Sequence, residues 1–93
     1  MNDKFATKII NLLNNCIDCA GLDRDKVMYT NPKECANGQY VDVCVEEYND
    51  EQLAYFVGFL AEIIGMKNIW LDTYPKSGRV HLELNFDEDF LAQ

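Results

Sequence analysis

The sequence contains the same short pattern twice, and this repetition constrains the fold more than any other feature. Each copy has an apolar stretch, a Thr-x-Pro-Lys segment, a glycine and a second stretch of alternating apolar residues. The two segments are Thr30–Lys33 and Thr73–Lys76, and they lie 43 residues apart. Because a fixed internal period reflects repeated structural units, the sequence predicts two helix–hairpin units over residues 3–47 and 50–86, related by a pseudo-twofold axis.

The first unit opens with a segment whose apolar residues recur at helical spacing. Over residues 3–19 they occupy one half of the helical circumference, and polar residues fill the other half. This pattern predicts an amphipathic helix. Gly21 is suited to the left-handed position that ends a helix, with Leu22 folding back behind it.

The second unit opens with a helix that is apolar nearly all round. Asn49 and Gln52 have the spacing of a capping box, and Gly65 marks the end. Such a helix is either deeply buried or shared with a partner. We expect it to pack against the first helix, and the alternative is a homodimer contact through Tyr55 and Phe59.

Four segments have the alternation of strands, and they complete the fold class. They are residues 27–30, 39–47, 68–74 and 79–86. A four-residue loop in the last hairpin places apolar residues opposite apolar ones and polar residues opposite polar ones. The chain is therefore predicted to be one α+β domain over residues 1–93, in the order α-β-β-α-β-β. Two helices would pack on one face of a four-stranded, mainly antiparallel sheet, and the acidic tail after residue 86 would be frayed.

The charge of the chain is strongly acidic and unevenly placed. The net charge is −8, with +1 over residues 1–33 and −9 over residues 34–93. Such a field repels nucleic acid and acidic membranes and favours a basic protein partner, although acidity also serves solubility alone. No secretory signal or membrane-spanning run is visible, so we expect a cytoplasmic location.

The four cysteines give no recognisable ligand pattern. Cys16 and Cys19 lie at the C-terminal end of the first helix, whereas thiolates are stabilised at N-terminal ends. Cys35 and Cys44 are not at a common zinc spacing. We therefore expect reduced, mostly buried cysteines and no metal or cofactor, and a zinc-binding module remains a third alternative for the function.

One face of the sheet is rich in aromatic and acidic side chains, and it is the predicted site. If both helices cover the aliphatic face, the other face is open to water. Tyrosine and tryptophan anchor interfaces, and surrounding carboxylates select a basic partner. The competing interpretation is that these aromatics only pair across strands or lie under a loop. The predicted partner-binding residues are Tyr40, Asp42, Glu46, Tyr48, Trp70, Asp72, Tyr74 and Glu83.

Catalysis has little support in the sequence. His81 is the one histidine, and on a strand it is expected to be a cross-strand partner of Asp72. No nucleophile motif or phosphate-binding loop is present. The preferred function is thus a non-enzymatic acidic binding module, such as an inhibitor that acts as a nucleic-acid mimic on a basic surface. The alternative class is a small dimeric chaperone or adaptor.

Overall fold

The fold is α+β, as the sequence predicts. The computed structural model describes residues 3–74 and 76–93. In these ranges the helical elements are α1 (Asp3–Cys19), η1 (Arg24–Lys26), α2 (Asp50–Ile64), η2 (Met66–Asn68) and α3 (Glu88–Leu91). The strands are β1 (Val27–Tyr29), β2 (Lys33–Cys35), β3 (Gly38–Val45), β4 (Ile69–Tyr74) and β5 (Arg79–Asp87).

The strands form one antiparallel sheet in the order β1-β3-β5-β4, and β2 pairs with β3 beyond the end of β1. The two long strands, β3 and β5, lie side by side in the centre. In the last hairpin Trp70 pairs with Glu83 and Leu71 pairs with Leu82, so the predicted register is confirmed. It follows that the two faces of the sheet are divided as the alternation in the sequence indicates.

The first hairpin is more elaborate than predicted. Between the two predicted strands over residues 27–30 and 39–47, Lys33–Cys35 forms the additional strand β2. One edge of the sheet therefore consists of two three-residue strands with the buried Pro32 between them. The other edge is the uninterrupted six-residue strand β4. Proline has no amide hydrogen to donate to a ladder, which explains the break.

The order of the strands agrees with a twofold axis through the sheet. The first unit supplies the edge strands β1 and β2 and the inner strand β3, and the second unit supplies the edge strand β4 and the inner strand β5. The Thr-x-Pro-Lys segments, however, do not match in place. Thr30 follows β1 and its segment leads into β2, whereas Thr73 lies within β4, opposite Val80. Pro75 lies outside the described residues. The superposition of residues 3–47 on 50–86 stays a prediction.

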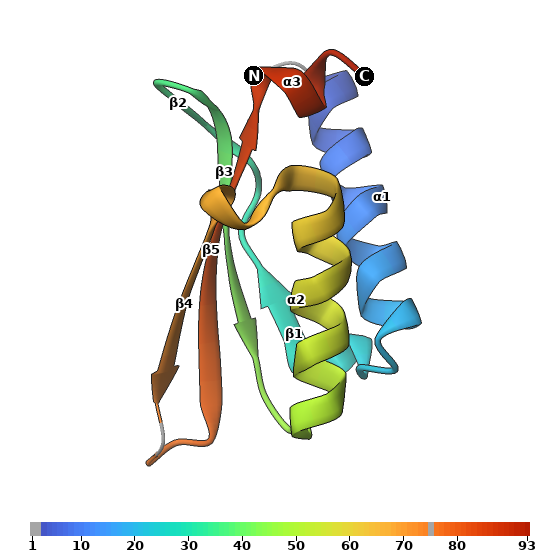
Figure 1. The fold of residues 1–93 in the computed structure, drawn as a ribbon, viewed down its shortest axis with the longest axis vertical. Helices are drawn as coiled ribbons and strands as arrows, with labels where there is room; N and C mark the ends of the chain where they lie inside the picture. The colour runs from blue at the N-terminus through green and yellow to red at the C-terminus, as the bar shows by residue number, and fades with distance from the viewer. Residues whose placement is uncertain (1–2, 75) are drawn as a thin grey trace.

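The two long helices cover the same face of the sheet, as Figure 1 shows. The inward residues of β3 and β5, from Val41 to Val45 and from Val80 to Phe86 in alternation, are fully buried. They meet Ile9 and Leu13 of α1 and Phe56 of α2 in one core. Burying these side chains supplies most of the favourable free energy of a domain this small.

The ends of both helices follow the predicted chemistry. Gly21 has φ +75°, and the amide of Leu22 bonds the carbonyl of Ile17 at 3.1 Å, as in a Schellman motif. At α2 the side chain of Asn49 accepts from the Gln52 amide, and the Gln52 side chain accepts from the Asn49 amide. These caps set where α1 ends and where α2 begins.

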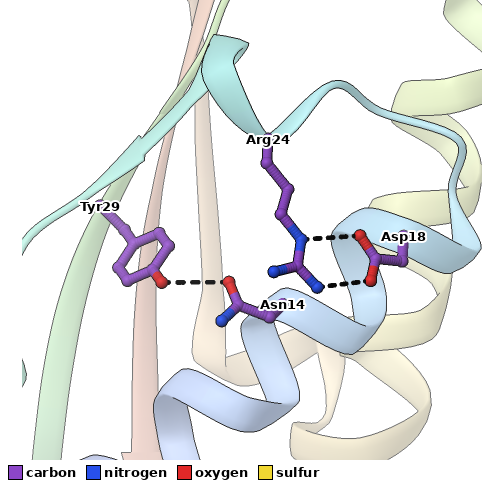
Figure 2. A network of polar contacts seen from close by, with 4 residues as sticks. All are labelled: Asn14, Asp18, Arg24 and Tyr29. Carbon is purple, nitrogen blue, oxygen red and sulfur yellow. Dashed lines mark hydrogen bonds and ion pairs between the residues drawn. The ribbon is translucent and has the colours of Figure 1, made fainter.

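A polar network holds the edge strand β1 and the turn η1 against α1 (Figure 2). Arg24 binds Asp18 through two hydrogen bonds of 2.9 and 2.6 Å, and the bonding lowers the pKa of that carboxyl. The Tyr29 hydroxyl donates to Asn14 at 3.0 Å. The residues between the first predicted helix and the first predicted strand therefore contain a short helix, η1, that ties β1 to the helical layer.

The prediction of a frayed C-terminal tail is wrong. Asp87 accepts a hydrogen bond from the Phe90 amide at 3.1 Å and so caps α3. Phe90 is buried against Phe86, with ring centroids 5.2 Å apart. Lys8 of α1 donates to the Phe90 carbonyl and stands over its ring. The acidic composition suggested disorder, but a single aromatic residue anchors the segment.

None of the described helices combines the length and the apolar character that crossing a membrane requires.

Candidate functional site

The face of the sheet opposite the helices carries the aromatic and charged residues that the sequence singled out. We call it the polar-aromatic face. Trp70 is 55% exposed and Tyr74 is 51% exposed, although both lie in a strand. The polar-aromatic face consists of the outward side chains of β3, β4 and β5. They are Tyr40, Asp42, Cys44, Trp70, Asp72, Tyr74, Arg79, His81, Glu83 and Asn85. Exposure of large aromatic rings on a helix-free face is typical of an interaction surface.

The carboxylates of this face fall into two groups. Asp42 lies 3.4 Å from His81 Nε2, and Glu46 lies 2.8 Å from Arg79 Nε. Asp72 and Glu83 are exposed, and no hydrogen bond or ion pair joins the side chain of either to another described residue. Asp42 and Glu46 therefore already contact basic side chains of the same face. The carboxylates of the face without a side-chain partner are thus Asp72, two residues from Trp70 along β4, and Glu83, which pairs with Trp70 across the ladder.

Tyr48 does not belong to this face, contrary to the prediction. The strand β3 ends at Val45 rather than at residue 47. Glu47 then takes a positive φ of 51°, which turns the chain and breaks the alternation. Tyr48 is partly buried against the hydrophobic core. Of the other predicted partner-binding residues, Glu46 also lies just past the strand, but its ion pair with Arg79 keeps it beside β5.

A hollow of about 590 Å³ opens on the polar-aromatic face near the turn between β2 and β3. We call it the Trp70 hollow. Trp70 and Tyr40 lie on opposite sides of β5, because they pair with Glu83 and Asn85 respectively. The side chains that carry its chemistry are those of Cys35, Tyr40, Lys67, Asn68, Trp70, Glu83, Asn85 and Asp87. The hollow therefore combines aromatic walls with carboxylates.

Sequence reasoning missed several residues of this hollow. Asp87 has the same parity as Glu83 and Asn85, and reading the last strand one residue further would have placed it on the face. It was instead assigned to the frayed tail. Lys67 and Asn68 lie in η2, between the end of α2 and the start of β4. Neither the helical nor the strand spacing of apolar residues applies to this short segment. No local pattern in the sequence points to them.

A metal ion has one candidate set of ligands within the described part of the chain. Asp42, His81 and Glu83 each offer one ligand atom, and these atoms lie within 4.8 Å of one another. Imidazole with two carboxylates suits a borderline divalent cation. A structural zinc site, however, uses four protein ligands, and the sheet already brings these three together, because Asp42 pairs with Glu83 across the ladder and contacts His81. The trio is not a basis for the function proposed below.

The cysteines are less buried than predicted. Only Cys16 is buried, and burial, with a smaller effect of Cys19, raises the pKa of its thiol to about 11. Cys19 and Cys35 are exposed, and Cys44 is intermediate. The helical pattern placed Cys19 at the margin of the apolar arc, and the end of α1 at that residue leaves it in solvent. That the cysteines are reduced and metal-free stays a prediction.

The second predicted contact surface lies on α2. The rings of Tyr55 and Phe59 stack at a centroid distance of 6.2 Å. Tyr55 is 51% exposed and Ile63, two turns along the same line of the helix, is 40% exposed. Phe59 is partly buried against the core.

Comparison with models of protein families, with curated proteins and with solved structures finds no match for the chain.

Proposed function

We propose that this chain is a non-enzymatic, acidic protein-binding module that binds a basic surface of a partner protein through its polar-aromatic face. The observation that carries the proposal is the exposure of Trp70 beside two carboxylates, Asp72 along β4 and Glu83 across the β4–β5 ladder, whose side chains have no hydrogen bond or ion pair with a described residue. An aromatic anchor with charged neighbours is the arrangement that gives an interface both affinity and fast, selective association.

The overall charge supports the choice of partner. The net charge of −8 makes approach to another acidic protein or to nucleic acid unfavourable and attracts a basic surface. A surface that binds nucleic acid is a basic surface of this kind, because phosphate contacts depend on lysine and arginine. Inhibition of nucleic-acid binding by the partner would then follow from occupation of that surface.

The test is retention of a partner by the immobilised chain from a cell lysate at low and high salt. We expect a basic protein that is retained at low salt and released at high salt, because exposed charges are screened. Retention should be lost in the double variant Asp72→Asn, Glu83→Gln. The matched control is Glu51→Gln, Glu62→Gln, which removes the same charge from exposed positions of α2.

Two outcomes would count against the proposal. One is a partner whose retention is equal in the face variant and the control, because charge alone would then explain the binding. The other is a partner retained in high salt through apolar contacts. If the retained protein binds nucleic acid, adding this chain should also displace that nucleic acid in competition.

A dimeric adaptor is the second candidate, and the stacked Tyr55–Phe59 pair on α2 favours it. A dimer through α2 leaves the polar-aromatic face free, so the two functions are compatible. Sedimentation of the wild-type chain and of Tyr55→Asp tests whether the chain forms a dimer through α2. A concentration-dependent dimer that the substitution abolishes would support the adaptor.

A further inference from the structure

The Trp70 hollow has a floor whose side chains are fixed before any partner arrives. Asn68 is buried, and its amide donates to the carbonyl of Ile64 at 2.7 Å and to Asp87 at 2.9 Å. Asn85 donates to Asn68 at 3.4 Å, and the Cys35 thiol donates to Asn85 at 3.2 Å. A ligand would therefore meet a preorganised surface and would not have to order it, which lowers the cost of binding.

The charges around the hollow favour a cation. The hydrogen bonds from the Phe90 amide and from Asn68 hold the pKa of Asp87 below its usual range, so this carboxyl is ionised at neutral pH. Glu83 adds a second carboxylate with no partner among the described residues. Lys67 is the one basic residue of the lining. The net charge of the side chains that line the hollow is therefore negative.

The aromatic walls narrow the class of cation. Trp70 and Tyr40 flank the floor from two different strands, and over half of the Trp70 side chain is open to solvent. Aromatic faces attract cations, and a planar guanidinium both stacks on them and bonds a carboxylate through two parallel N–H donors. An ammonium makes only point contacts and is more strongly hydrated.

We propose that the Trp70 hollow receives an arginine side chain of the basic partner, with the guanidinium lying beside Trp70 and paired with Glu83. This rests on the function proposed above and names the side chain that the polar-aromatic face recognises. It assigns separate roles to the two free carboxylates. Glu83 selects the arginine, while Asp72 adds to the field that attracts the partner without lining the hollow.

The experiment uses three blocked pentapeptides that differ at the central residue, Gly-Gly-X-Gly-Gly with arginine, citrulline or lysine. Citrulline keeps the shape of arginine and lacks the charge. Trp70 is the one tryptophan of the chain, so its fluorescence and its indole N–H resonance report on the hollow directly. A single side chain binds weakly, and we expect saturation by the arginine peptide with a Kd on the order of 1 mM.

The expected pattern has two parts. Citrulline should bind at least tenfold more weakly than arginine, and lysine should lie between them. Glu83→Gln should weaken the arginine peptide about tenfold, and Glu62→Gln on α2, which removes the same charge far from the sheet face, should leave it unchanged. Equal binding of arginine and citrulline, or equal effects of the two glutamate variants, would overturn the proposal.

The outcomes separate this proposal from the function on which it rests. If no peptide binds while a basic partner is still lost from the Asp72→Asn, Glu83→Gln variant, the face binds its partner but the hollow does not take an arginine. If no peptide binds and the partner is also retained equally by the variant and its control, the proposed function fails as well. Both are supported if the arginine peptide binds the wild type and Glu62→Gln equally and Glu83→Gln about tenfold more weakly, and if the partner is lost from the Asp72→Asn, Glu83→Gln variant alone.

Discussion

Trp70 and Glu83 lie directly opposite each other across the β4–β5 ladder, on the sheet face that the helices leave open. The indole is 55% exposed, so this pair presents an aromatic surface and a carboxylate to solvent at one place. A cross-strand pair of this kind can contribute to the stability of the sheet. Substitution of Trp70 separates the contribution of this pair to stability from its contribution to partner binding.

Trp70→Ala should reduce affinity for the partner by about 2 kcal/mol or more, as truncation of an aromatic anchor does. It should lower the free energy of unfolding by no more than about 1 kcal/mol, the range of strand-propensity effects. Isothermal titration and urea unfolding measure the two quantities. Phe56→Ala is the opposite case: the ring is fully buried, and its loss should cost about 3–5 kcal/mol of stability. Large unfolding by Trp70→Ala would mean that the face is structural.

Two glycines should respond in opposite directions to alanine. At Gly38, where φ is +136°, an added Cβ would lie 2.1 Å from the backbone oxygen of Phe86. Gly38→Ala should therefore destabilise the fold by more than about 1 kcal/mol. At Gly58, within α2, nothing lies within 4 Å of an added Cβ, and Gly58→Ala should stabilise by about 0.5–1 kcal/mol. Chemical denaturation tests both, and equal effects would contradict the backbone geometry.

Cys16 should make the protein less stable in alkali. Its pKa is raised to about 11 by burial, above that of an exposed thiol, so the folded state binds the proton more tightly than the unfolded state. The stability that results is complete below about pH 8.5 and is lost as the pH rises toward 11, by up to about 2–3 kcal/mol. The free energy of unfolding should fall more steeply over this range in the wild type than in Cys16→Ala. Equal slopes would show that the thiol is not desolvated.

Asp87 should support the C-terminal helix through its cap. Asp87→Ala removes the acceptor for the Phe90 amide and should cost about 1 kcal/mol. Since bonding lowers the pKa of Asp87, its contribution is present above about pH 4 and is lost as the pH falls further. Hydrogen exchange of the Phe90 amide follows the opening of α3. Asp89→Asn, which removes a charge from the same helix but no cap, should exchange as slowly as the wild type.

The thiols should differ in reactivity according to their burial. Cys19 and Cys35 are exposed and Cys16 is buried, so a maleimide added to the native protein should modify the first two and spare the third. Peptide mapping after brief labelling identifies the sites. Native mass spectrometry of the unlabelled chain tests the prediction that no zinc is bound, and a stoichiometric adduct that acid removes would contradict it.

The sequence predicted the structure correctly where neighbouring residues decide it. The register of Trp70 with Glu83, the capping box at Asn49 and the turn at Gly21 all follow from residues close together in the chain. The prediction failed where a distant contact decides the structure. Phe90 orders the acidic tail only because Phe86 and Lys8 receive it.

The candidate site shows the same division. Tyr40, Trp70, Asp72 and Glu83 could be placed on one face from strand parity alone. The hollow could not, because Asn68 reaches it from a short helix and β2 was read as a turn. Tyr48 was misplaced for a comparable reason: the positive φ at Glu47 interrupts an alternation that the sequence alone would continue.

The two edges of the sheet differ in their capacity to accept another strand. The β1–β2 edge is interrupted at Pro32, whereas β4 offers six residues in an unbroken row. Adding a strand requires a continuous set of free backbone amides and carbonyls, so the described part of each molecule has one such edge. Strand pairing between copies would consequently join two molecules edge to edge and stop there, because neither would have a second edge with which to continue into a filament. The irregular first hairpin thus sets an upper limit on polymerisation.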